Sequence, residues 1–263
     1  MKRYLWLAPF AGIAGFLGVW ELFVRVFDIE SYKLPRPSDV VRDIVTNRSA
    51  YWYDAWPTIA VSVAGFALAL VVAFAIASIC AHSAFVERAV SAIAIVVLVT
   101  PLFAYGAAIV LWVGFGYRPI VLMVAIVCFP PLLFNAVSGL RDIDPLAHEL
   151  LRSVHASRWE VYRRLRVPNA VPSLMAGAKV SAGLSLVGAV IGEPWAFLDR
   201  GLGVLIRKAA AAGTVGGPLL WGSIFVLGLI GSFAYLAISG IERIALHWHS
   251  ASSASVGVSS SIR

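Results

Sequence analysis

The stretch from Asp144 to Pro172 reads DPLAHELLRSVHASRWEVYRRLRVPNAVP and lies between two long apolar runs. Six arginines occur between Arg141 and Arg166. Arginine is costly in hydrocarbon and is enriched in the cytoplasmic loops of membrane proteins. We therefore expect this segment to be a cytoplasmic loop that contacts a soluble partner, and its position determines how the rest of the chain crosses the bilayer.

The residue pattern predicts two short helices within this loop. Pro145 suits the first position of a helix. Apolar residues then recur at helical spacing: Leu146, Leu150, Leu151 and Val154. Ser157 is a candidate N-cap of the second helix, with Glu160 three residues later as its capping-box partner. A turn at His155-Ala156 would join the helices into a compact knob with Trp159, Tyr162, Leu165 and Arg166 on one face.

The composition indicates an integral membrane protein. Of 263 residues, 60% are hydrophobic and 13% charged, and the mean hydropathy is +0.86. A soluble domain cannot stay in solution with this composition. Arginine-rich cytoplasmic loops explain the net charge of +7, and no zinc-finger spacing or long basic tail favours a nucleic-acid partner. Cys80 and Cys128 lie inside apolar runs, so we expect buried thiols and neither a disulfide nor a metal site.

Six runs are apolar enough to cross a bilayer, which takes about 20 residues. They are Tyr4–Trp20, Pro57–His82, Ala89–Tyr117, Pro119–Leu140, Pro172–Gly192 and a last run whose helix we place from about Leu219 to Ile241. Lys179 interrupts the fifth run, and a lysine near a helix end can extend to the headgroups. The first run lacks a small-x-small cleavage site before Trp20, so we expect it to be retained. The sequence thus predicts an all-α, polytopic membrane protein with about six transmembrane helices.

The distribution of arginine predicts the orientation. The outer loop Asp28–Trp56 carries four basic and five acidic residues, against six arginines in the later loop. This bias favours cytoplasmic N- and C-termini in a multi-pass protein of the cell (inner) membrane. We expect a transmembrane domain over residues 1–249, with a cytoplasmic loop at 141–172, and a disordered tail over residues 250–263.

Two further features belong to the outer loop. Pro37-Ser38-Asp39 is a helix-start signal, and the apolar residues that follow predict a short helix on the membrane surface. Aromatic residues then precede the second span and are expected to anchor it at the interface: Tyr51, Trp52, Tyr53 and Trp56.

Several spans contain helix breakers or small residues. Pro101 in the third run and Pro130-Pro131 in the fourth can bend a helix, either as gate hinges or as static kinks. The fifth span is rich in small residues, among them Ser181, Ser185, Gly188 and Gly192. Small residues allow close helix packing, and lining of a polar passage is the second interpretation. The candidate gate or pathway residues are Pro101, Pro130, Ser181, Ser185, Gly188 and Glu193.

The loop resembles the cytoplasmic coupling motif of ABC importer permeases, E-A-A-x3-G-x9-I-x-L-P. Glu149-Leu150-Leu151 takes the acidic-plus-small triplet and His155 takes the glycine; Leu165, Val167 and Pro168 take the final positions. The flanking residues are similar to the branch with sulfonate, taurine, nitrate and thiamine-precursor permeases. Further similar stretches are Trp20-Glu21, Leu34-Pro35-Arg36-Pro37-Ser38, Leu111–Gly116, Gly201-Leu202-Gly203 and a glutamate at Glu193.

The resemblance implies a type I ABC importer permease fold and a homodimer of permease chains. An external substrate-binding protein would deliver a small solute, and two cytoplasmic ATPase subunits would bind the loops. The resemblance implies that Glu149 makes a polar contact to the ATPase, with Arg152 and Arg158 in support. The other expected loop residues are Leu150, Leu151, His155, Ser157, Trp159, Leu165, Val167 and Pro168, with Pro168 and Pro172 ending the coupling helices.

The chain has no glycine-rich loop ending in Gly-Lys-Ser/Thr, so we expect no cofactor of its own and ATP binding by the partner subunit. Two residues depart from the motif. His155 stands where the family has glycine, a strained choice if the turn needs a positive φ. Leu150-Leu151 replaces two alanines and makes the contact bulkier.

Four alternatives remain at this point. The loop could be an interfacial hairpin without a partner, or the chain could be an inactive permease. A membrane-embedded enzyme needs converging titratable groups at depth, and the spans have almost none. A secondary transporter should show a mid-membrane carboxylate or a repeated pair of broken helices, and neither is visible.

Overall fold

The structure is a computed structural model that describes residues 8–246 of the chain, and within that range it is all-α, as predicted. The helices along the long axis are α1 (Ala8–Val26), α3 (Arg48–Cys80), α4 (Ala84–Val99), α6 (Tyr117–Arg141), α9 (Val167–Trp195) and α11 (Gly217–Ala245). The shorter ones are α2 (Pro37–Thr46), α5 (Leu102–Val113), α7 (Pro145–Ser153), α8 (Arg158–Val161) and α10 (Leu202–Ala211). A π-helical turn (Tyr162–Arg166) joins α8 to α9, and a 3₁₀ turn (Gly213–Val215) precedes α11. The predicted tail over residues 250–263 lies outside the described residues.

Four helices in the described range are long and apolar enough to span a membrane: α3, α6, the continuous α8–α9 unit and α11. The α4–α5 pair makes a fifth span if it is counted as one. The predicted first span corresponds to α1, although its start at Tyr4 lies outside the described residues. Over the residues described, α1 does not meet the same test of length and composition.

The third predicted span is corrected, because it is two helices rather than one. The chain bends by 103° between α4 and α5, and the break falls at Thr100-Pro101. Thr100 is extended, with φ −78° and ψ 126°. The residue before a proline avoids the helical region, so Pro101 ends α4 and starts α5 in a new direction. Pro130 and Pro131, in contrast, lie inside an uninterrupted α6.

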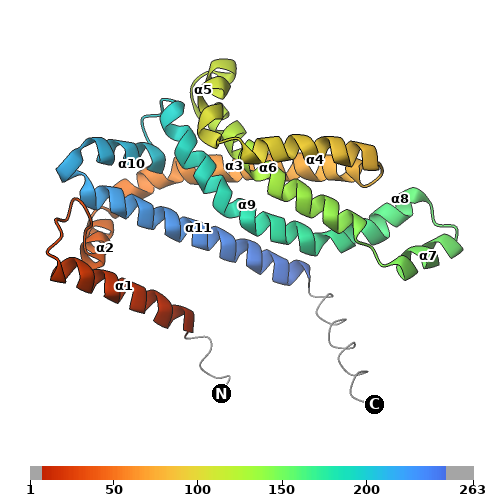
Figure 1. Cartoon of the computed structure of the whole chain (residues 1–263), viewed down its shortest axis with the longest axis horizontal. Helices are drawn as coiled ribbons and strands as arrows, with labels where there is room; N and C mark the ends of the chain where they lie inside the picture. Colours follow the sequence, from red (N-terminus) through yellow and green to blue (C-terminus); the bar gives the residue numbers. More distant parts are fainter. Residues whose placement is uncertain (1–7, 247–263) are drawn as a thin grey trace, which may run out of the picture.

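Helix α6 is the centre of the bundle, with α3 and α9 packed against it (Figure 1). Glycines on both neighbours allow this close approach, and on α3 it is Gly65, where a Cβ atom would collide with Val124 of α6. A Cβ atom on Gly188 of α9 would lie 2.9 Å from the Cα of Val124 on α6, and one on Gly177 would lie 2.9 Å from the Cβ of Asn135. The prediction that small residues of the fifth span serve close packing is confirmed at these positions.

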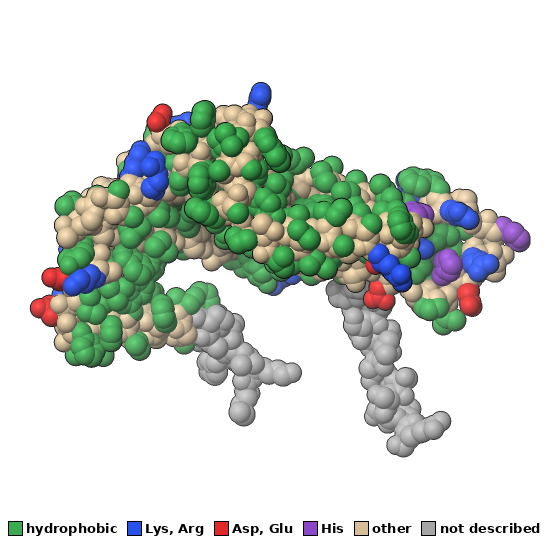
Figure 2. Space-filling model, turned by 45° about the horizontal axis from the view of Figure 1, so that its top comes forward, with side chains coloured by type: hydrophobic (Ala, Val, Ile, Leu, Met, Phe, Trp, Pro, Cys, Tyr) green, Lys and Arg blue, Asp and Glu red, His purple; other side chains and the backbone are tan. Residues whose placement is uncertain are grey.

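Short helices and most of the charged side chains lie at the two ends of the molecule. In Figure 1, α2 and α10 lie at one end of the long axis, and α7 and α8 project from the other. Hydrophobic side chains cover much of the length between them, whereas charged side chains lie mostly toward the ends (Figure 2). This distribution suits a bundle whose long axis crosses a bilayer.

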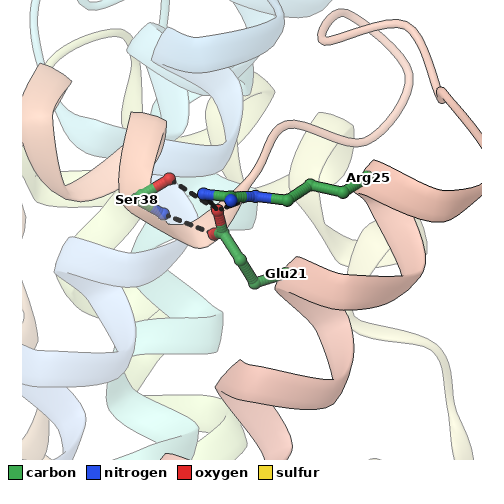
Figure 3. A network of polar contacts seen from close by, with 3 residues as sticks. All are labelled: Glu21, Arg25 and Ser38. Carbon is green, nitrogen blue, oxygen red and sulfur yellow. Dashed lines mark hydrogen bonds and ion pairs between the residues drawn. The ribbon is translucent and has the colours of Figure 1, made fainter.

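The α2 end is fixed by a carboxylate of α1 (Figure 3). Glu21 Oε2 accepts a hydrogen bond from the Ser38 backbone N–H at 3.1 Å, and Oε1 accepts one from the Ser38 hydroxyl at 2.9 Å. Arg25 Nη2 pairs with the same carboxylate at 2.7 Å. Glu21 therefore satisfies the Ser38 N–H at the open N-terminus of α2 and holds α2 against α1. The predicted short helix after Pro37 is confirmed.

One local expectation for the last two spans needs correction. Lys179 does not extend to the headgroups alone but forms an ion pair with Glu242 of α11. Helix α11 begins at Gly217, two residues before the predicted start near Leu219, and the uncharged run before it forms part of α10 and the 3₁₀ turn. Cys80 and Cys128 are free and buried, as expected.

Candidate functional site: the α7–α8 hairpin

The predicted cytoplasmic knob is a helical hairpin, which we call the α7–α8 hairpin (residues 144–166). Asp144 caps α7, because its Oδ1 accepts a hydrogen bond from the Leu146 N–H at 3.0 Å, and Pro145 occupies the start of the helix. The predicted first helix is confirmed. It ends at Ser153, two residues before the turn at His155.

The turn between the helices places His155 in the left-handed region, with φ +58°. The His155 N–H donates to Arg152 O and the Ala156 N–H donates to Leu151 O, both at 3.0 Å. This pair of bonds is the Schellman arrangement that closes a helix with a left-handed residue after it. Glycine adopts this conformation without a steric penalty, whereas a side chain costs on the order of 1 kcal/mol. The turn therefore does require the conformation for which the resembled motif has glycine.

The second helix starts with the predicted capping box. Ser157 Oγ accepts from the Glu160 N–H at 3.2 Å, and Glu160 Oε2 accepts from the Ser157 N–H at 2.9 Å and from its hydroxyl at 3.0 Å. The backbone bond and then the hydroxyl bond lower the pKa of the Glu160 carboxyl below its ordinary value. The carboxylate therefore stays charged at neutral pH and fixes the direction in which the chain leaves the turn.

The second helix does not end before the fifth span, which corrects the role predicted for Pro168 and Pro172. Helix α8, the π-helical turn and α9 form one unit of 38 residues from Arg158 to Trp195. The Val167 N–H bonds to Tyr162 O five residues back, so the hydrogen-bond register shifts just before Pro168. Pro168 has no N–H to place in the ladder, and the shift lets the helix continue past it. At 1.5 Å per residue the unit is about 57 Å long, more than the bilayer core, so its hairpin end projects from the membrane.

The hairpin base is anchored on the turn between α3 and α4. Tyr162 stacks on Trp159 with ring centroids 5.6 Å apart, and its hydroxyl lies 2.6 Å from Ser78 Oγ. Arg166 Nη1 donates to Ala81 O at 2.9 Å. Arg141, at the end of α6, pairs with Glu87 of α4. A force on the hairpin would therefore reach α3 and the α3–α4 turn, as well as α9, into which α8 continues.

The outer surface of the hairpin exposes apolar side chains on a polar segment. The exposed fractions are 74% for Leu146, 67% for Leu150, 66% for Val154 and 66% for Trp159. The first three lie four residues apart along α7 and form one stripe. Glu149, Arg152 and Arg158 are exposed around them, whereas Leu151, Leu165 and Val167 are half-buried and Pro168 is exposed. Such a stripe outside the apolar band indicates a contact surface for another protein.

The candidate pathway residues lie at separate places in the bundle. Pro101 is at the α4–α5 break, and Pro130 is buried within α6. Ser181 and Ser185 are buried in α9, where Ser181 Oγ donates to Cys128 O at 3.3 Å and Ser185 Oγ donates to Ala182 O at 2.8 Å. Gly188 packs on α6. The structure does not bring them to one site, and their role in a pathway stays a prediction.

Glu193 forms a buried network at the end of α9 that the sequence did not reveal. Its side chain is 0% exposed. Thr58 of α3 donates a hydrogen bond to Glu193 Oε1 at 2.5 Å, and the Gly203 N–H donates to Oε2 at 2.7 Å. Thr58 Oγ1 also accepts from the Leu202 N–H at 2.9 Å. The carboxylate thus joins α3, α9 and the start of α10. Within residues 8–246, no group of three or more His, Cys, Asp or Glu side chains lies close enough together to hold a metal ion.

The sequence did not predict this hydrogen-bond network because the partners of Glu193 are distant in the chain. Thr58 lies 135 residues from Glu193 and is one of several uncharged residues in an apolar run. The sequence singled out Glu193 and the nearby Gly201-Leu202-Gly203 by resemblance, but nothing in it connected them to each other or to Thr58. Gly201 has φ +138°, and a Cβ atom there or on Gly203 would collide with the Glu193 carboxylate or the backbone of Val190. The two glycines let the backbone approach the buried carboxylate.

Comparison with known proteins identifies a matching family, similar permeases and a solved structure of similar fold. The family described as "Binding-protein-dependent transport system inner membrane component" matches residues 65–245. The formylaminopyrimidine transport permease protein ThiX of Halalkalibacterium halodurans is 29% identical over 250 residues, which cover 94% of this chain and 98% of ThiX. The riboflavin transport system permease protein RibX of Chloroflexus aurantiacus is 29% identical over 231 residues, which cover 87% and 85% of the two chains.

Matches at lower sequence identity are also proteins of transport systems. The taurine transport system permease protein TauC of Escherichia coli is 24% identical over 244 residues, 90% of this chain and 88% of TauC. An inward-facing structure of the MetNI methionine ABC transporter superposes with a TM-score of 0.65 at 17% identity, covering 75% of this chain and 97% of that chain. At this identity the likeness concerns the fold alone. The family match includes the whole α7–α8 hairpin.

Proposed function

The chain belongs to the family of binding-protein-dependent transport system inner membrane components, and on this premise we propose that its α7–α8 hairpin is the contact through which a separate ATPase drives it. The chain is a membrane-spanning permease subunit of an ABC importer, located in the inner membrane with several crossings. It is a transport protein and performs no bond chemistry in the proposed cycle.

The observation that carries the proposal is the exposed apolar stripe on a hairpin with a fixed shape. Leu146, Leu150 and Val154 are each about two-thirds exposed or more, beyond the apolar band of the bundle. Burying one such side chain against a partner contributes about 1.5–3 kcal/mol. Glu149 lies next to Leu150 and can add a polar contact at the rim, with Arg152 and Arg158 in support.

The continuous α8–α9 unit supplies the mechanical link. The hairpin turn and Ser157 cap fix the direction of α8, and the helix runs without interruption into α9. Helix α9 packs closely on α6 through small residues, where there is little room for independent movement. A push on the hairpin would therefore displace α9 and α6 together, as rigid elements do in alternating access. Pro101, at the α4–α5 break, is the candidate hinge for such a movement.

The remaining parts of the importer follow from the family. We propose a homodimer of permease chains with two cytoplasmic ATPase subunits, which bind ATP, and an external substrate-binding protein. The hairpin and the end of α11 would face the cytoplasm together with the N-terminus, and α2 and α10 would face the binding protein. Residues 1–249 would form the permease domain, with a tail after them.

The solute is a small organic molecule in this proposal. The relatives are named for transport of formylaminopyrimidine, riboflavin and taurine, which differ in both size and chemical class. Such breadth among similar permeases supports selection of the solute by the binding protein rather than by this chain.

Co-purification with the cognate ATPase tests the proposed contact. Leu150→Asp places a charge in the apolar stripe and should reduce the recovered ATPase by about tenfold, which corresponds to about 1.4 kcal/mol. Val215→Asp is the matched control, since Val215 is 84% exposed and lies in the 3₁₀ turn between α10 and α11, at the opposite end. Equal recovery with the two variants, or solute uptake by vesicles without ATP, would contradict the proposal.

A further inference from the structure

A pocket of about 460 Å³ lies between the α7–α8 hairpin and the turn that joins α3 to α4. Its charged lining comes from both sides. Arg152, Arg158, Arg166 and His148 belong to the hairpin, and His82 belongs to the turn. Figure 2 shows arginine and histidine side chains gathered over this end of the molecule.

The pocket has an unbalanced positive charge. Its lining contains three arginines and two histidines but no aspartate or glutamate. None of the ion pairs formed within residues 8–246 involves Arg152, Arg158 or Arg166. Two nearby carboxylates have other partners, because Glu160 closes the capping box and Glu87 pairs with Arg141. Like charges held close together repel one another unless a counter-charge lies between them.

Two of the lining residues are held in place. Arg166 donates to Ala81 O at 2.9 Å, and His82 Nδ1 lies 2.7 Å from Ser78 O. A carbonyl oxygen can only accept, so Nδ1 carries the proton in this contact. Both walls of the pocket are thus fixed on the α3–α4 turn, while Arg152 and Arg158 have exposed side chains that can adjust to a ligand.

We propose that this pocket binds a phosphate group. Guanidinium groups bind phosphate oxygens through paired, charge-assisted hydrogen bonds, and three of them around one volume suit a multiply charged tetrahedral anion. The volume leaves room for bridging waters as well. A bound phosphate would neutralise the pocket and connect the hairpin to the α3–α4 turn, independently of any ATPase contact.

Two sources can provide such a group. The α3–α4 turn follows a membrane-spanning helix, so the pocket lies near the level of the lipid headgroups, where basic pockets bind anionic lipids. Its position on a projecting hairpin also gives free inorganic phosphate access from water. The chemistry of recognition is the same in both cases.

The test uses the full chain and thermal unfolding followed by tryptophan fluorescence. Inorganic phosphate is added to protein in nanodiscs of phosphatidylcholine, with chloride at equal ionic strength as the reference. In a second arm, the nanodiscs contain phosphatidylglycerol and no phosphate is added. Stabilisation by free phosphate identifies the soluble anion as ligand, and stabilisation only by phosphatidylglycerol identifies the headgroup; either result supports the site.

Variants decide whether the effect arises in this pocket. Arg152→Gln and Arg158→Gln should each weaken the apparent affinity for the stabilising probe by about tenfold, because one charge-assisted contact is lost. Arg163→Gln is the matched control, an exposed arginine between α8 and α9 that does not line the pocket. Arg166→Gln also removes the contact to Ala81, so the two exposed arginines carry the test.

Three results would overturn the site. The first is that neither probe stabilises the wild-type chain. The second is that both probes stabilise all variants equally, which would indicate a general salt or lipid effect. The third is that Arg152→Gln weakens co-purification with the ATPase while no probe binds, which would make the pocket part of a protein contact.

Discussion

The two polar regions of this permease, the α7–α8 hairpin and the Glu193 network, are built in opposite ways. The turn and the helix starts of the hairpin are shaped by contacts between residues at most five apart, such as the Ser157–Glu160 capping box and the Schellman bonds around His155, and only the hairpin base is held by distant residues, through Tyr162 and Arg166. The Glu193 network joins residues up to 144 apart and is completely buried. One region holds its shape while remaining open to water, and the other depends on the packing of three helices.

This difference suggests different roles. A region whose turn and helix starts are set by local contacts can present an apolar stripe to a partner while the bundle holds only its base, which suits the hairpin. A buried carboxylate with donors from α3 and α10 fixes how the spans meet at the far end, which suits a structural joint. Mutations should therefore separate stability from coupling.

The largest effect is expected from Glu193→Ala. The substitution leaves the buried Gly203 N–H without an acceptor, and it leaves the Thr58 hydroxyl only its longer contact to Asp54 O at 3.3 Å. An unsatisfied buried group costs about 1–3 kcal/mol, so we expect the free energy of unfolding to fall by about 2 kcal/mol. Thermal or denaturant unfolding in detergent, together with the folded yield, measures this loss.

A double-mutant cycle with Thr58→Val sharpens that prediction. Since the Thr58 hydroxyl and Glu193 bind each other, the two substitutions should be less than additive, with a coupling of at least about 0.5 kcal/mol. Additive losses, or a stability change below about 1 kcal/mol for Glu193→Ala alone, would mean that the network does not hold the joint.

Glu149→Lys is expected to act on coupling and not on stability. The side chain is exposed on the hairpin beside the apolar stripe, so reversal of its charge should leave folding and insertion intact. ATP-dependent uptake in proteoliposomes should fall by about tenfold, while ATP hydrolysis continues. Glu30→Lys is the control, because Glu30 is exposed in the loop between α1 and α2, where it pairs with Lys33. Unchanged uptake in Glu149→Lys would remove this residue from the contact.

The smallest effect is expected from His155→Gly. Glycine adopts φ +58° without strain but gains more freedom in the unfolded chain, so the net gain in stability should be below about 1 kcal/mol. Uptake should be maintained or improved. Melting temperature and uptake are measured beside His155→Ala, which keeps a Cβ atom but lacks the ring. Loss of uptake in both variants would show that the imidazole itself contributes to coupling.

The sequence predicted the parts of this structure that depend on neighbours in the chain. The all-α class, the start of α7 at Pro145, the capping box and the helix after Pro37 all follow from patterns within a few residues. The need for a left-handed residue at His155 came from the resemblance and agrees with the observed φ.

Other features depend on contacts that no local pattern shows. Pro168 was expected to end a helix, but the π-helical turn before it shifts the register so that the helix continues. Lys179 was expected to reach the headgroups, but Glu242 of α11 lies close enough to pair with it. Pro101 and Pro130-Pro131 were both expected to bend a helix, but only Pro101 coincides with a sharp break, whereas Pro130 and Pro131 lie inside an uninterrupted α6.

The most direct test of the account is the side of the membrane on which the hairpin lies. Val154→Cys introduces a thiol at a position that is 66% exposed, while the native Cys80 and Cys128 are buried. A membrane-impermeant maleimide should label this thiol in inside-out vesicles and not in right-side-out vesicles, and bound ATPase should protect it. Labelling in right-side-out vesicles would place the hairpin outside the cell and contradict the proposed contact.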